Sequence, residues 1–89
     1  MLIAHTDHQE RTTDMLATAI VYTDTRPEPY LFRATLRYVE YYLLPRIEEG
    51  DPRPIEFTLT TGESATISPA SIISLEVQGP DFNDTIYIR

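Results

Sequence analysis

Two proline-containing breaks limit how this chain can fold. They lie at residues 24–29 (DTRPEP) and 50–54 (GDPRP), and proline ends regular elements because its ring fixes φ and removes an N–H donor. A chain of 89 residues supports one hydrophobic core, so each of the three parts must contribute elements to the same core. We therefore expect residues 1–89 to form a single domain, with residues 1–14 as a segment that could stay flexible.

The part before the first break contains a predicted strand at residues 15–23 (MLATAIVYT). Apolar side chains occupy both alternating faces, and four of the nine residues are β-branched. This composition favours a buried strand. Thr6 and Gln9 have the spacing of a capping box, so a short helix in this region is the alternative.

The part after the second break predicts a β-meander. Four short β-like runs cover residues 55–60, 64–67, 72–77 and 85–88, with tight turns at Thr61-Gly62 and at residues 79–81. The stretch LTTGESATISPASIISLEV resembles the strand-turn-strand-corner-strand course of small Sm-like or SH3-like barrels. That resemblance concerns architecture only, because such barrels bind RNA, peptides or one another.

The middle part, Tyr30 to Pro45 (YLFRATLRYVEYYLLP), fits an amphipathic helix over its full length. Strand-like alternation is also acceptable over residues 30–38, but it fails at Glu40. At about 100° per residue, a helical wheel puts one set of residues on a broad apolar arc: Leu31, Phe32, Thr35, Leu36, Val39, Tyr42 and Leu43. We expect an α+β fold in which one central helix, about 29–44 with a bend at Pro45 and a cap at Gly50, packs on an antiparallel sheet of 4–5 strands, with a small partly open barrel as an alternative form.

A surplus of tyrosine extends the apolar surface of this predicted helix. With four further residues, the apolar surface covers roughly two-thirds of the circumference of the helix, which is more than one small sheet can bury. These residues are Tyr30, Ala34, Tyr38 and Tyr41. We expect another protein chain to cover the excess, and coverage by the N-terminal residues is the alternative. Tyr and Arg are enriched at interface hot spots. The predicted partner-binding residues are Tyr30, Arg33, Arg37, Tyr38 and Tyr41.

The charge and the missing residue types exclude several activities. The formal net charge is -7, and the chain contains no cysteine and no lysine. Disulfides, thiolate metal sites, a cysteine nucleophile, a Schiff base and a P-loop lysine are therefore excluded. Direct nucleic-acid binding is disfavoured because the chain has 14 acidic residues and only seven arginines to neutralise phosphates. An acidic surface that competes with nucleic acid for a basic partner is instead predicted at Glu48, Glu49, Asp51, Glu56, Glu63 and Glu76.

One cluster has the residue types of a metal site. His5, Asp7, His8 and Glu10 could in principle bind zinc or another divalent ion, but they lack a regular helical ligand spacing. A solvated polar turn is the preferred interpretation, so no metal and no cofactor are expected. The histidines could also join a serine in hydrolysis, yet no serine lies in a GxSxG elbow.

These observations favour a soluble, cytoplasmic, non-enzymatic module for protein–protein interaction. Its expected role is an inhibitor or adaptor of a larger assembly, by analogy of class with the anti-defence proteins of phages and mobile elements. We expect a protein partner, most simply a second copy in a homodimer, and no membrane contact. The alternatives are a structural subunit of an oligomeric ring or virion-like assembly, and a protein that binds a small ligand or nucleotide at a dimer seam.

Overall fold

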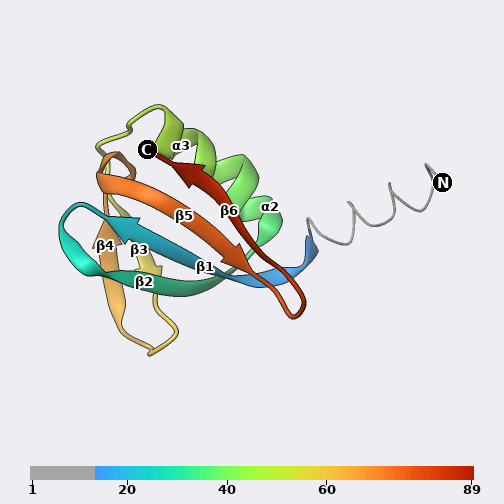
Figure 1. The fold of residues 1–89 in the computed structure, drawn as a ribbon. Coiled ribbons are helices and arrows are strands. Elements are labelled where there is room, and N and C mark those ends of the chain that lie inside the picture. Colours follow the sequence, from blue (N-terminus) through green and yellow to red (C-terminus); the bar gives the residue numbers. More distant parts are fainter. Residues whose placement is uncertain (1–13) are drawn as a thin grey trace.

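The fold is α+β, with one helix on a four-stranded sheet and a separate two-stranded sheet (Figure 1). The computed structural model describes residues 14–89. Its large sheet has the order β2-β1-β5-β6 and its small sheet pairs β3 with β4; all pairs are antiparallel and the sheet does not close into a barrel. The strands are β1 (Leu16–Thr23), β2 (Arg26–Thr35), β3 (Ile55–Thr58), β4 (Ser64–Ile67), β5 (Ile72–Gln78) and β6 (Asn83–Ile88).

Strand β1 confirms the strand predicted before the first break. Its buried residues alternate with half-buried ones, so Ala17, Ala19 and Val21 face the core while Thr18 and Ile20 lie on the other sheet face. β1 is also the central partner in the sheet, because it pairs with β2 on one side and with β5 on the other. Its second face, with Thr18, Ile20 and Tyr22, is half-buried.

Strand β2 corrects the predicted start of the helix. Residues 29–35 are extended rather than helical, and they pair with β1 in the register Ala19 to Phe32 and Val21 to Tyr30. Alternation over residues 30–38 was compatible with either structure, and the long-range pairing with β1 decides for the strand. Pro27 and Pro29 fit because β2 lies at an edge of the sheet, where a missing N–H breaks no ladder.

The helix begins only at Leu36 and runs without interruption to Glu48. It consists of α2 (Leu36–Tyr38), a wide π turn over Val39–Leu43, and α3 (Leu44–Glu48). Thr35 is the N-cap, and its hydroxyl accepts a hydrogen bond of 3.1 Å from the Tyr38 N–H. The helix continues through Pro45, where a bend was predicted, and the π turn ends two residues before it; the wider turn suits a residue that lacks an N–H and crowds the preceding turn.

Gly50 caps the C-terminal end of the helix, as predicted. Its φ of 68° lies in the left-handed region, which glycine adopts without a steric penalty. The Gly50 N–H donates to the Ile47 carbonyl and the Asp51 N–H to the Arg46 carbonyl, both at 3.0 Å. These two bonds form a Schellman motif, which ends the helix and fixes the direction of the loop that follows.

The core lies between the helix and the large sheet. The helix buries Leu36, Val39, Leu43 and Ile47, while the β3–β4 hairpin adds Phe57 and Ile67. The predicted C-terminal strands are all present, but they do not form one meander. β4 ends at a short 3-10 turn, Pro69–Ser71, after which β5 pairs with β1 instead of β4. The chain therefore makes two sheets from one run of strands.

Within residues 14–89, no helix is long and apolar enough to cross a membrane.

Candidate functional site

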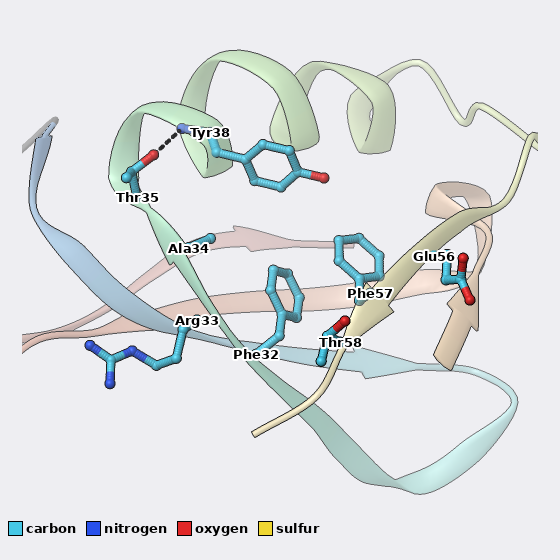
Figure 2. Close-up of a pocket in the computed structure, with 8 residues that line it drawn as sticks. All are labelled: Phe32, Arg33, Ala34, Thr35, Tyr38, Glu56, Phe57 and Thr58. Atoms are coloured by element: carbon cyan, nitrogen blue, oxygen red, sulfur yellow. Dashed lines mark hydrogen bonds between the residues drawn. The ribbon is translucent and has the colours of Figure 1, made fainter. Parts of the chain in front are cut away.

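A groove opens where the two sheets meet. β2 and the residues directly after β3 are joined by one bridge, Phe32 to Leu59, and by a 2.9 Å hydrogen bond from the Thr60 N–H to the Leu31 carbonyl. No further strand pairing joins β2 to β3 in the described part of the chain. The resulting groove has a volume of about 350 Å³. We call it the aromatic groove (Figure 2); its lining residues are Phe32, Arg33, Ala34, Thr35, Tyr38, Glu56, Phe57 and Thr58.

The floor of the aromatic groove is formed by two phenylalanine rings, and polar and charged side chains complete its lining. The rings of Phe32 and Phe57 stack with their centroids 4.3 Å apart and join the two sheets. Figure 2 shows the Tyr38 side chain extending from the start of the helix above these rings, whereas the Arg33 guanidinium points away from it. The N-cap bond from Thr35 fixes the backbone from which Tyr38 projects. Phe32 and Phe57 are only 3% and 6% exposed, so half-buried Tyr38 offers the larger aromatic surface to a partner side chain.

Tyr38 is the first member of a polar chain along one flank of the helix. Its ring lies 5.1 Å from that of Tyr42, and the Tyr42 hydroxyl accepts a 2.7 Å hydrogen bond from Arg46. Burial raises the pKa of Tyr38 above its usual value, and the neighbouring Tyr42 phenol adds to this, while Arg46 acts in the opposite direction. The Tyr38 phenol is consequently neutral at physiological pH and can both donate and accept a hydrogen bond.

The same flank ends in a compact ion-pair network around Asp51. One carboxylate oxygen accepts from Arg46 Nε at 2.9 Å and from Arg53 at 2.8 Å, and the other accepts from the Arg53 backbone and Nε at 3.0 Å each. Hydrogen bonds from the side chain and backbone of Arg53, followed by that from Arg46, hold the pKa of Asp51 well below its usual range. The network ties the helix end to the loop that leads into β3.

Asp51 is therefore not part of an exposed acidic surface. Its side chain is only 5% exposed, and both of its oxygens are occupied by arginine. The other predicted acidic residues lie on separate elements. Glu48 and Glu49 are exposed at the helix end, Glu56 and Glu63 on the β3–β4 hairpin, and Glu76 is half-buried on β5. Of these, Glu56 alone lines the aromatic groove.

The five predicted partner-binding residues do not share one helix face. Tyr30 and Arg33 belong to β2, and the Tyr30 ring is covered by the Arg26 guanidinium at 3.7 Å. Arg37 is on the helix and pairs with Asp14 at 3.1 Å.

Two of the five residues, Arg33 and Tyr38, line the aromatic groove, while Tyr41 is 67% exposed and lies outside it. Sequence reasoning missed the groove's two phenylalanines. Phe57 lies in the strand predicted at residues 55–60, but no local sequence pattern predicts that its ring stacks on Phe32.

The remaining candidates for chemistry are dispersed. His5, Asp7, His8 and Glu10 lie outside the described residues, and residues 14–89 contain no group of three or more His, Asp or Glu side chains that could hold a metal ion. A smaller cavity of about 170 Å³ is lined largely by hydroxyl side chains, among them Ser68 and Ser71. Both serines already donate hydrogen bonds to carbonyl groups, Ser68 to Pro52 and Ser71 to Ser68.

Comparison with known proteins finds no matching family model, no matching curated protein and no matching solved structure.

Proposed function

We propose that this protein is a non-enzymatic protein-binding module that holds an extended segment of a partner protein in the aromatic groove. The observation that carries the proposal is the groove itself, with stacked phenylalanines below and Tyr38 above a space of about 350 Å³. That volume accommodates a large apolar side chain together with its neighbouring backbone. In protein interfaces a few residues, often tyrosine, tryptophan or arginine, supply most of the binding energy.

The strand edges beside the groove favour an extended partner segment. The Leu31 carbonyl faces β3, so the two-residue period of a strand directs the main-chain groups of Arg33 and Thr35 toward the same side. On β3, the Leu59 N–H donates toward β4 at 2.7 Å, so the main-chain groups of Glu56 face the groove. Thr35 and Glu56 have no strand partner across the gap within the described residues. An added strand would satisfy the Thr35 N–H and the main-chain groups of Glu56, as in β-augmentation, whereas the Thr35 carbonyl belongs to the first turn of the helix.

The charge of the chain favours a basic partner. The net charge is -7, and exposed Glu56 and Glu63 lie on the hairpin that forms one side of the groove. A negative field attracts basic segments and accelerates their association. We therefore describe the occupant as an apolar anchor flanked by Lys or Arg. By holding such a segment, the module would act as an inhibitor or adaptor of a larger assembly, in competition with the nucleic acid that basic surfaces often bind.

The test uses a displayed library of random linear peptides selected on the full chain. The expected products carry one large apolar residue flanked by basic residues, and their affinity falls as salt concentration rises. Tyr38→Ala should raise the dissociation constant of a selected peptide on the order of 30-fold, because it removes the roof of the groove. Tyr41→Ala is the matched control, since it deletes the same side chain from the same helix outside the groove, and should leave the dissociation constant within about twofold.

Two outcomes would contradict the proposal. One is a selection that enriches no common sequence. The other is a selected peptide whose affinity responds equally to Tyr38→Ala and Tyr41→Ala, because binding would then not depend on the groove.

A further inference from the structure

We propose that this chain binds a small carboxylate with an apolar body on the face of the large sheet that the helix does not cover. The site is an open pocket of about 280 Å³, which we call the sheet-face pocket; its lining residues are Leu16, Thr18, Arg33, Gln78, Gly79 and Pro80. It shares only Arg33 with the aromatic groove. The inference concerns a second ligand and does not rest on the proposed function.

The strand register brings three polar side chains of this pocket into one row. Thr18 on β1 pairs with Arg33 on β2 and with Gln78 on β5. Directly paired residues point to the same sheet face, with Cβ atoms about 4.5–5.5 Å apart. The neighbours of Thr18 along β1, Ala17 and Ala19, are buried in the core, so the row lies on the opposite face. A guanidinium, a hydroxyl and a carboxamide therefore project side by side from three adjacent strands.

Arg33 is exposed and has no side-chain partner among residues 14–89. Every other arginine in that range donates a side-chain hydrogen bond. Arg33 donates none to a described residue, although the chain carries 14 acidic residues against seven arginines. Glu76 lies on the same sheet face, opposite Ile20 of β1, and no ion pair joins it to Arg33 in the described structure. Figure 2 shows the Arg33 guanidinium pointing away from the phenylalanine rings of the aromatic groove, so its N–H donors are available on the sheet-face side.

The chemistry of the row favours a carboxylate over a phosphate. A planar guanidinium matches a carboxylate through two parallel hydrogen bonds, and the Thr18 hydroxyl and Gln78 amide are further donors beside it. One cation does not neutralise a dianion, and the net charge of -7, with Glu76 on the same face, repels a second negative charge. Leu16 is 51% exposed and lines the pocket together with Pro80, so the body of the ligand is apolar.

The test titrates the isotope-labelled full chain with benzoate and, separately, with benzamide, and follows the amide signals by NMR. Benzoate carries a carboxylate on a flat apolar ring, and benzamide has nearly the same shape without the charge. Benzoate should shift the signals of Thr18, Arg33 and Gln78 in a saturable way, with a dissociation constant on the order of millimolar because the ion pair is open to water. Benzamide should bind about tenfold more weakly or worse.

Variants assign the binding to this pocket. Arg33→Gln should abolish the preference for benzoate over benzamide, because it removes the charge and keeps a polar side chain. Arg37→Gln is the matched control, since it removes an exposed arginine from the helix and changes the net charge equally; benzoate affinity should stay within about twofold of wild type. Gln78→Ala should weaken benzoate binding about two- to tenfold. It should leave the affinity for a peptide selected on the aromatic groove unchanged, because Gln78 does not line that groove.

Three results would overturn the inference. The first is a wild-type chain that shows no saturable shifts, or that binds benzoate and benzamide equally. The second is a benzoate affinity that Arg33→Gln and Arg37→Gln reduce equally, because binding would then follow net charge instead of this pocket. The third is a set of shifts centred on other arginines, such as Arg53 and Arg89. Melting curves show whether Arg33→Gln folds; if it does not, an unchanged benzoate affinity in Gln78→Ala would also overturn the inference.

Discussion

At the scale of single residues, Asp51 shows how one buried acid can organise two neighbouring elements. Its backbone N–H completes the helix cap, while its carboxylate binds the side chains of Arg46 and Arg53. Removing one member of such a network leaves the other charges unpaired. The loop that sets the start of β3, and with it the position of Phe57 in the groove, depends on this residue.

The pH dependence of stability should follow from Asp51. Its pKa is lower in the folded protein than in the unfolded chain, so the unfolded chain takes up a proton first as the pH falls. The stabilisation is therefore present above about pH 4 and is lost progressively as the pH drops toward the folded pKa. Asp51→Asn should lower the melting temperature at pH 7 and flatten its decline in acid. Glu48→Gln, at an exposed position, is the control and should change neither. Equal melting curves for Asp51→Asn and wild type would contradict this role.

At the scale of elements, the helix is held by a narrow buried stripe. Leu36 is 1% exposed and lies directly after the Thr35 cap, where the chain leaves β2. Leu36→Ala should lower the free energy of unfolding by about 2–5 kcal/mol, because it removes buried carbon and leaves a cavity. Tyr41→Ala, on the exposed side of the same helix, should cost within about 0.5 kcal/mol. Urea unfolding measures both, and a cost below about 1 kcal/mol for Leu36→Ala would show that this site collapses or is not core.

The elements also show what local pattern can and cannot predict. Local sequence predicted two of the strands, at residues 15–23 and 64–67, and the helix cap at Gly50. Alternation, β-branched residues and glycine each influence the backbone conformation of their own segment. The start of the helix was not predictable. The apolar residues within residues 30–35 fit both the alternation of a strand and the periodicity of a helix, and the pairing with β1 decides for the strand. Thr35, three residues before Tyr38, was the available cap signal.

At the scale of the whole molecule, the α+β class followed from the order of the elements, but the sheet order did not. β5 joins β1 instead of β4, and this choice creates both the gap between the sheets and the free edge at β6. Tyr38 was predicted as a partner-binding residue and lines the aromatic groove. Phe32 and Phe57 were not predicted there, because they meet through the packing of two sheets. The residues of the predicted acidic surface lie on separate elements in the structure and do not form one patch.

The central claim is that the aromatic groove receives an extended segment of a partner. The most direct test is amide NMR of the isotope-labelled full chain titrated with a peptide selected on the wild type. Binding should shift the amide signals of Arg33, Thr35, Tyr38, Glu56 and Thr58, and it should slow hydrogen exchange at Thr35 and Glu56, as expected for an added strand. Shifts confined to the exposed helix side around Arg37 and Tyr41, with no added protection at Thr35 or Glu56, would contradict the claim.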